Sequence, residues 1–176
     1  MNIPVFDANG GHAPRRPDGV PPMLELPEAA AALRASAVLV YPTETFFAIG
    51  CLALDAAAVE KIFAAKHRPD GKTLPLLAAD AAQVDMVADM GAMPQLLRRF
   101  WPGPLTVLLP ARPGLPPALV NAEGKVAVRV TPHPQAAALA RAAGAPLTSS
   151  SANISGRAAV SSLAALEDAL LSRVDG

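Results

Sequence analysis

The 176-residue chain contains little cysteine, few aromatic residues and no net charge. A single cysteine, Cys51, excludes an intramolecular disulfide framework and fits a reducing compartment, so we expect a cytoplasmic protein. Only 4% of residues are aromatic although 52% are hydrophobic, which predicts a core of alanine, valine and leucine on closely packed elements. The zero net charge argues against a general nucleic-acid coat protein but still allows a local basic cavity.

Long apolar runs are also missing. None approaches the roughly 20 residues that cross a bilayer, so we expect a soluble protein, and the N-terminus lacks an apolar stretch of signal-peptide length. Residues 1–22 are rich in proline and glycine without a hydrophobic period, which predicts a flexible or loosely docked arm. Residues 23–176 then suit one domain of ordinary size.

Apolar segments of two kinds alternate after this arm. Helical patterns occupy residues 25–36, 56–66, 133–144 and 161–173. Short apolar runs, predicted as strands, occupy residues 37–42, 74–80, 105–110 and 125–130. This alternation predicts an α/β fold in which a mixed open sheet is flanked by helices.

The segment KHRPDGK, residues 66–72, concentrates three fixed cations and a histidine. Lys66 falls on the apolar stripe of the preceding helix, and Pro69 biases Arg68 towards an extended conformation, so both side chains can converge on one cleft. Lys72 follows after a turn. Three cations around one cleft repel each other unless an anion such as phosphate fills it. The alternative is a solvated basic end of a helix.

Two polar loops follow predicted strands. TSSSANISG, residues 148–156, lies where open α/β sheets bind ligands, and Ser151 and Asn153 share i, i+2 spacing. Hydroxyl, amide and backbone N–H groups can hold phosphate or ribose oxygens, although such a stretch can also be a turn that caps the next element. YPTETFFAIG, residues 41–50, opens a strand into a loop with Thr43, Glu44 and Thr45.

Other reactive residue types carry weaker signals. Cys51 has no histidine near it in sequence, so we do not expect a nucleophile there. The histidines His12, His67 and His133 lack metal-ligand spacing, and we expect no metal site formed by the protein. Trp101 is interpreted as a packing anchor at a turn, and His133 is expected to begin a helix.

Five segments in a fixed order carry a family resemblance. YPTETFFAIGC, KHRPDGKTLPLLAAD, FWPGPLTVLLP, VAVRVTPHP and SSANISG together span Tyr41 to Gly156, about two-thirds of the chain. They resemble, respectively, the motifs Y-P-T-(D/E)-T-x-(Y/F)-G-(L/I)-G, K-x-R-P-x-x-(K/N)-P-L, F-W-P-G-P-L-T, V-A-V-R-x-P-x-H-P and P-S-A-N-x-S-G of the YrdC-like family of threonylcarbamoyl-AMP synthases.

The resemblance implies a strongly twisted mixed open sheet around a concave, electropositive cavity. It implies synthesis of L-threonylcarbamoyl-adenylate from L-threonine, bicarbonate or CO₂, and ATP, with release of pyrophosphate. A tRNA-modification complex would receive the adenylate to form N6-threonylcarbamoyladenosine at tRNA position 37. ATP would enter with Mg²⁺, no tightly bound cofactor is expected, and weak RNA binding is a further expectation.

The same resemblance implies roles for individual residues. On the nucleotide side it places ATP ligands, the first two also stabilising the transition state: Lys66, Arg68, Lys72, Ser151 and Asn153. On the amino-acid side it places threonine-binding residues: Thr45, Arg129 and Ser149.

Several positions depart from the family pattern. Ala48 replaces a glycine, Thr73 and Ser150 each replace a proline, and Leu77 replaces a substrate-contacting histidine. The family pattern also continues beyond Gly176 with a closing strand, which we expect the domain 23–176 to lack. Two alternatives stay open: a non-catalytic module that binds duplex RNA or tRNA, and a carbamoyl-adenylate domain like that of hydrogenase-maturation carbamoyltransferases, which resembles this family.

Overall fold

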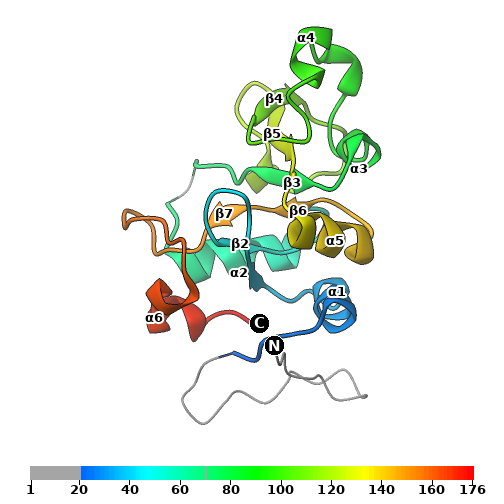
Figure 1. The fold of residues 1–176 in the computed structure, drawn as a ribbon. Coiled ribbons are helices and arrows are strands. Elements are labelled where there is room, and N and C mark those ends of the chain that lie inside the picture. Colours follow the sequence, from blue (N-terminus) through cyan, green and yellow to red (C-terminus); the bar gives the residue numbers. More distant parts are fainter. Residues whose placement is uncertain (1–20, 70) are drawn as a thin grey trace.

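The computed structural model describes residues 21–69 and 71–176, so the predicted N-terminal arm lies almost wholly outside the described residues. Figure 1 shows how the elements are arranged. The helices are α1 (Leu26–Arg34), α2 (Ala56–Lys66), α3 (Ala81–Asp85), α4 (Gln95–Arg98), α5 (Pro134–Ala143) and α6 (Asp168–Leu171). The strands are β1 (Leu39–Tyr41), β2 (Ala48–Gly50), β3 (Leu76–Ala78), β4 (Val107–Pro110), β5 (Lys125–Val130), β6 (Leu147–Thr148) and β7 (Ser150–Ser151).

The strands form two sheets, one antiparallel and one mixed, whereas the sequence pattern predicted a single mixed sheet. The three-stranded sheet has the order β1-β2-β7 and is antiparallel. The four-stranded sheet has the order β4-β5-β3-β6, in which only β3 and β5 are parallel. The α/β class and the flanking helices are therefore confirmed, and the number of sheets is corrected.

The two sheets share one long antiparallel run, which explains why the prediction of one sheet failed. Residues 48–53 lie along residues 146–151 in a single register, with these aligned pairs: Ala48 with Ser151, Ile49 with Ser150, and Leu52 with Leu147. At Ser149 the backbone N–H turns away and donates to the carbonyl of Pro75 (2.8 Å), the residue that precedes β3 of the other sheet. The chain thus passes from one sheet to the other at Ser149.

A close approach of the backbone at Gly50 accompanies this crossing. A Cβ atom there would lie 2.0 Å from the Thr148 carbonyl oxygen and 2.9 Å from a ring carbon of Tyr41. No real side chain tolerates the first distance, so only glycine allows β2 to pack this tightly against the end of β6.

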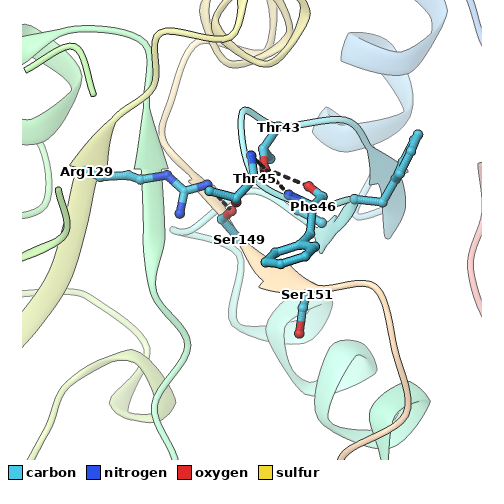
Figure 2. A pocket seen from close by; sticks show the side chains of 8 residues that line it. Thr43, Thr45, Phe46, Arg129, Ser149 and Ser151 are labelled. Carbon is cyan, nitrogen blue, oxygen red and sulfur yellow. Dashed lines mark hydrogen bonds between the residues drawn. The ribbon is translucent and has the colours of Figure 1, made fainter. Parts of the chain in front are cut away.

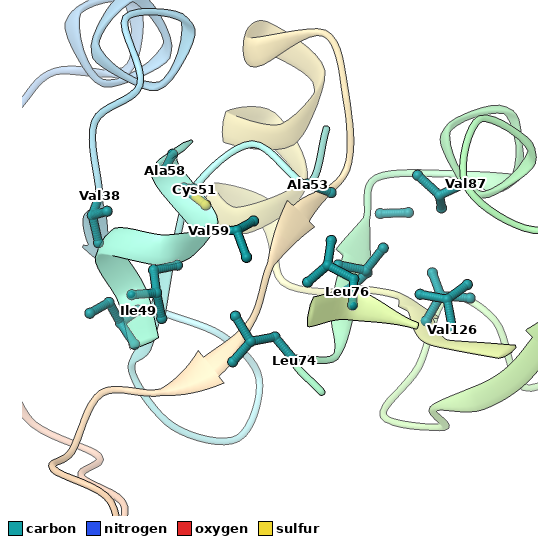
Figure 3. Close-up of a cluster of buried hydrophobic side chains, with 14 of the residues drawn as sticks. Val38, Ile49, Cys51, Ala53, Ala58, Val59, Leu74, Leu76, Val87 and Val126 are labelled. Atoms are coloured by element: carbon teal, nitrogen blue, oxygen red, sulfur yellow. The ribbon is translucent and has the colours of Figure 1, made fainter. Parts of the chain in front are cut away.

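Alternate strand residues enter two hydrophobic clusters, because side chains point to opposite faces of a sheet. Leu76 and Ala78 join the cluster beneath α2, whereas Leu77 joins the cluster beneath α1 and α5. Val126, Val128 and Val130 all face the first cluster, as their spacing predicted, and Figure 3 shows that cluster. Leu77 is fully buried beside the aligned position of Arg129.

Local signals placed two helices correctly. Asp55 accepts a hydrogen bond from the Ala58 N–H (3.0 Å) and begins α2, while Gly144 ends α5 with a positive φ of 87°. His133 begins α5, and the Ala136 N–H donates to its Nδ1 (3.4 Å).

The helix predicted over residues 161–173 is wrong in its length. The structure has a 3₁₀ turn at Leu163–Ala165 and then the short α6, with an extended Glu167 between them. Burial of Leu166 and Leu170, together with a contact between the Glu167 carboxylate and Arg157, outweighs the helical propensity of the alanine and leucine residues in this segment.

The last residues lie beside β1. The Asp175 N–H donates to the Val38 carbonyl (2.8 Å), and the Val40 N–H donates to the Gly176 carbonyl (2.8 Å). Val38 N–H also donates to the Asp175 carboxylate (2.9 Å). Over residues 21–69 and 71–176, no helix has the length and apolar character needed to span a membrane.

Candidate functional site

A cavity of about 180 Å³ opens at the junction of the two sheets, as Figure 2 shows. Its lining comes from the β1–β2 loop, β2, β5 and the β6–β7 crossing: Thr43, Thr45, Phe46, Phe47, Ala48, Arg129, Ser149 and Ser151. The volume lies below the roughly 300–1,000 Å³ of pockets that enclose drug-sized ligands. It suits a group of the size of an amino acid, whereas a whole nucleotide would have to extend beyond it.

The β1–β2 loop is shaped by Thr43. Its hydroxyl donates to the Phe46 carbonyl (2.6 Å) and accepts from the backbone N–H groups of Thr45 and Phe46 (3.3 Å each). The Thr45 hydroxyl lies 3.2 Å from that of Thr43. This local bonding holds the exposed Thr45 at the cavity edge.

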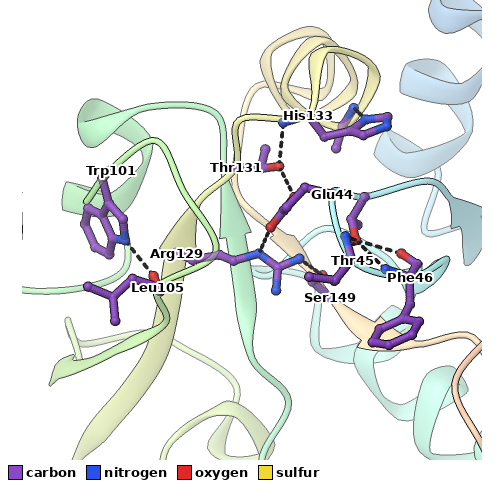
Figure 4. Close-up of polar contacts among 11 residues, drawn as sticks. Glu44, Thr45, Phe46, Trp101, Leu105, Arg129, Thr131, His133 and Ser149 are labelled. Carbon is purple, nitrogen blue, oxygen red and sulfur yellow. Dashed lines mark hydrogen bonds and ion pairs between the residues drawn. The ribbon is translucent and has the colours of Figure 1, made fainter. Parts of the chain in front are cut away.

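Arg129 approaches the same cavity from the polar face of β5. Its Nε lies 3.0 Å from Oε1 of Glu44, without the angle of a hydrogen bond, and its Nη2 donates to the Ser149 hydroxyl over 3.4 Å. The other Glu44 oxygen accepts from the Thr131 hydroxyl (2.7 Å), which in turn accepts from the His133 N–H (3.1 Å). Figure 4 shows this line of contacts.

A buried tyrosine, Tyr41, supports the crossing between the two sheets. The Tyr41 hydroxyl donates to the Thr148 carbonyl (2.7 Å), next to the crossing at Ser149. Burial raises the pKa of Tyr41 above its usual range, so the phenol stays protonated and remains a donor. This bond fixes the strand end that carries Ser149 towards Arg129.

Lys66 is the largest fully buried residue in the described part of the chain and is only 1% exposed. Its ammonium group donates to the backbone carbonyls of Ser151 and Asn153, the second over 2.5 Å. Burial, and then the nearby Arg68, lower the pKa of Lys66 to about 8. The alternative of a solvated helix end is therefore wrong for Lys66, which ties the end of α2 to the serine-rich loop.

Arg68 turns back onto its own segment. Its Nε donates to the Lys72 carbonyl and its Nη2 to the Thr73 carbonyl, each over 2.8 Å. Burial lowers the pKa of Arg68. Among the described residues, neither Lys66 nor Arg68 forms an ion pair with a carboxylate. The side chain of Lys72 is exposed.

The turn after α2 allows these two cations to converge. His67 adopts a left-handed conformation (φ 48°) and ends the helix, and the Arg68 N–H donates back to the Phe63 carbonyl (3.0 Å). Arg173 also reaches this helix end, where it contacts the His67 ring and donates to the Ala65 carbonyl (3.3 Å).

Asn153 follows Ser151 and is buried. Its amide nitrogen donates to the Ile154 carbonyl (2.9 Å) and the Arg157 carbonyl (2.7 Å), which fixes the orientation of the amide. In the described part of the chain, its Oδ1 and the Ser155 hydroxyl are buried polar atoms without a hydrogen-bond partner. Such atoms are costly unless a ligand or water satisfies them.

The predicted site residues therefore fall into two neighbouring groups. Thr45, Arg129, Ser149 and Ser151 line one cavity. Lys66 donates to the backbone carbonyls of Ser151 and Asn153, and Arg68 lies close enough to lower its pKa. The Lys72 side chain is exposed and forms no ion pair within the described residues. Glu44 stood out in its loop in the sequence, but neither its contact with Arg129 nor any role for Thr131 was predicted. The acidic position within the loop motif was the one signal for this contact.

Cys51, the described histidines and Trp101 lie outside the two groups of site residues. Burial raises the pKa of Cys51 to about 12, so its thiol stays protonated near neutral pH. Within the described ranges, no group of three or more histidine, cysteine or acidic residues is placed to hold a metal ion. Trp101 packs against the core and its indole N–H donates to the Leu105 carbonyl (2.7 Å), as a packing anchor would.

The chain is similar in sequence to a known family and to named bacterial proteins. The Sua5/YciO/YrdC family model, described as "Telomere recombination", matches residues 31–176. A protein from Methylococcus capsulatus named threonylcarbamoyl-AMP synthase is 45% identical over 130 residues, which are 73% of this chain and 70% of that protein. A protein of the same name from Stenotrophomonas maltophilia is 39% identical over 157 residues, covering 87% and 84%.

A solved structure agrees with the sequence comparisons. The crystal structure of P. abyssi Sua5 complexed with L-threonine aligns with a TM-score of 0.71 at 35% identity. The alignment covers 80% of this chain and 43% of that one, so the chain spans less than half the length of this structural relative. By its sequence motifs, its fold and these relatives, the chain belongs to the Sua5/YciO/YrdC family.

Proposed function

We propose that the chain is a threonylcarbamoyl-AMP synthase, which joins L-threonine, bicarbonate or CO₂, and ATP. One observation carries the proposal: Ser151 belongs to both groups of site residues. Ser151 lines the small cavity together with Arg129, and its backbone carbonyl accepts a hydrogen bond from the ammonium group of Lys66. An amino acid in the cavity would therefore lie next to a phosphate chain held by the cations.

The cavity supplies what an α-amino acid needs. The Arg129 guanidinium suits a carboxylate, and hydroxyl groups of Thr45 and Ser149 offer partners for the polar atoms of threonine. The cavity volume of about 180 Å³ agrees with a ligand of this size. Leu77 is fully buried at the β3 position aligned with Arg129, and its hydrocarbon side chain would supply no polar contact to the substrate.

The neighbouring group supplies what a triphosphate needs. Lys66 and Arg68 bear charges that repel each other, so an anion between them would be stabilising. Asn153 Oδ1 and the Ser155 hydroxyl, which lack a hydrogen-bond partner among the described residues, would bond the nucleotide, Oδ1 as an acceptor and the hydroxyl as a donor or acceptor. We assign Lys72 to the solvent side of the phosphates, and we place the strongly twisted, concave and electropositive surface of the family around these residues.

The chemistry then follows from position and charge. The threonine amine adds to CO₂ and loses a proton, which gives an N-carboxylate. An oxygen of this carboxylate attacks the α-phosphorus of ATP, the bond to the β-phosphate oxygen breaks, and pyrophosphate leaves. The reaction requires charge neutralisation and alignment more than a protein nucleophile.

Mg²⁺ would enter on the phosphate oxygens of ATP, as it usually does, and the described residues offer no cluster of three ligands to hold it alone. The product would pass to a tRNA-modification partner. A non-catalytic RNA-binding module, the alternative, would instead bind RNA in a salt-sensitive way and turn over no ATP.

The test is release of pyrophosphate from ATP in the presence of bicarbonate, with and without L-threonine. We expect release that requires L-threonine and yields a threonylcarbamoyl-adenylate detectable by mass spectrometry. Arg112→Ala is the matched control, because Arg112 is an exposed arginine paired with Asp85, outside both groups of site residues. Threonine-independent release, or none at all alongside salt-sensitive RNA binding, would overturn the proposal.

A further inference from the structure

Glu44 is a partly enclosed carboxylate that does not line the cavity. Its side chain is 14% exposed, and that of its partner Arg129 is 12% exposed. Its two oxygens have different partners: Oε1 lies 3.0 Å from Nε of Arg129 in an ion pair without hydrogen-bond geometry, and Oε2 accepts a hydrogen bond from the Thr131 hydroxyl (2.7 Å). Both oxygens of Glu44 therefore face groups of the protein.

The contact occupies one particular side of the guanidinium. Glu44 meets Nε, the nitrogen nearest the stem, whereas Nη2 points to the Ser149 hydroxyl at the cavity. Figure 4 shows the guanidinium between these two partners. A guanidinium held at Nε loses its rotation about the stem, so its terminal N–H groups keep one direction.

Glu44 is itself held by Thr131, whose hydroxyl donates to it. Thr131 is 2% exposed, its N–H donates to the Ala78 carbonyl (3.1 Å), and its hydroxyl accepts from the His133 N–H (3.1 Å). The β1–β2 loop, which carries Glu44, is thereby tied to the end of β5 and the start of α5. The loop and the arginine form one unit across the two sheets.

We propose that Glu44 is a positioning residue that holds Arg129 so that its terminal N–H groups can bind the carboxylate of an amino-acid substrate. This inference rests on the proposed function, because it assumes that the cavity takes L-threonine. It carries a distinctive consequence. Loss of the Glu44 charge leaves the pocket more positive, which by itself would strengthen carboxylate binding; a positioning role predicts the reverse.

The test compares Glu44→Gln, Glu44→Asp and Thr131→Val with the unaltered chain. L-threonine binding is measured by titration calorimetry, which needs no turnover, and KM and kcat are measured in the pyrophosphate assay. We expect Glu44→Gln to weaken L-threonine binding about 5- to 50-fold, with kcat at saturation and KM for ATP changed less than about threefold. Glu44→Asp should recover part of the loss, and Thr131→Val should show a smaller one.

A ligand without the carboxylate separates orientation from general damage. L-threoninol should bind the unaltered chain weakly, and Glu44→Gln should leave that binding unchanged. Glu60→Gln, an exposed glutamate on α2, is the control and should match the unaltered chain in every measurement.

The outcomes separate this inference from the proposed function. If the unaltered chain binds L-threonine and Glu44→Gln binds it equally well or more tightly, the positioning role is overturned while the function stands. If the unaltered chain does not bind L-threonine at all, the proposed amino-acid pocket fails, and this inference fails with it. A loss shared equally by L-threoninol would indicate general damage to the cavity and would also overturn the positioning role.

Discussion

The two cationic regions of this chain are built in opposite ways. Arg129 has an acidic partner, Glu44, within 3.0 Å, and the pair is supported by Thr131. Lys66 and Arg68 have no acidic partner within the described residues and instead donate to backbone carbonyls. One region balances its charge internally, whereas the other leaves two positive charges close together.

The difference indicates what each region can bind. A paired arginine has a fixed direction and little excess charge, which suits recognition of one carboxylate by geometry. Unpaired cations repel each other and become more stable when a strong anion arrives, which suits a triphosphate on which negative charge moves to the leaving pyrophosphate during reaction. Geometry would select the amino acid, and charge would hold and activate the nucleotide.

The largest expected effect lies in the unpaired region. Arg68→Ala should lower threonine-dependent pyrophosphate release about 100- to 1,000-fold, because it removes a cation from the phosphates in the transition state. The free energy of unfolding should change little, since within the described residues the Arg68 side chain bonds carbonyls of its own segment. A loss below tenfold in the release assay, with Arg112→Ala as control, would remove Arg68 from the phosphate site.

A substitution in the paired region should lower substrate affinity and stability. Arg129→Met should raise KM for L-threonine about 10- to 100-fold and affect KM for ATP far less. It should also lower the free energy of unfolding in urea by about 3 kcal/mol, because Glu44 is left without its cation. Adding Glu44→Gln should recover most of the stability but none of the affinity; a double variant no more stable than the single one would contradict the pairing.

The pH dependence of stability should distinguish the regions next. The pKa of Lys66 is lowered from 10.5 to about 8, so between these values the unfolded chain binds more protons than the folded chain. The stability of the unaltered chain relative to Lys66→Met should therefore rise by about 1–2 kcal/mol from pH 8 to pH 10. Saturating ATP should flatten that rise, because a triphosphate favours the charged lysine; a difference that does not vary with pH would contradict burial of the charge.

The smallest effect is expected at the edge of the unpaired region. Lys72→Ala should raise KM for ATP only about two- to fivefold at low salt, and the change should fade as salt is added, since an exposed charge is screened. Lys61→Ala is the control, because Lys61 is an exposed lysine that bonds the Ser36 carbonyl on another part of the surface. A salt-independent effect of Lys72→Ala would indicate a direct, enclosed contact.

Features that depend on neighbouring residues were predictable from the sequence. The start of α2 at Asp55 and the end of α5 at Gly144 follow from caps that bond within a few residues. The inward face of β5 follows from alternation of its valines. By contrast, the helix expected over residues 161–173 shortened because its contacts with the rest of the chain outweighed local preference.

Family membership, and with it most of the candidate site residues, was recognisable because five motifs keep their order along the chain. The sequence alone determined the residue types in these segments: the cations of residues 66–72, the hydroxyls of residues 148–156 and the arginine of β5.

Only the tertiary structure decided which of these residues contact one another. Glu44 reaches Arg129, and Lys66 reaches the carbonyls of Ser151 and Asn153, because the chain changes sheets at Ser149 and brings distant segments together. Contacts between distant segments depend on how the whole domain packs, and a local sequence pattern does not predict that packing.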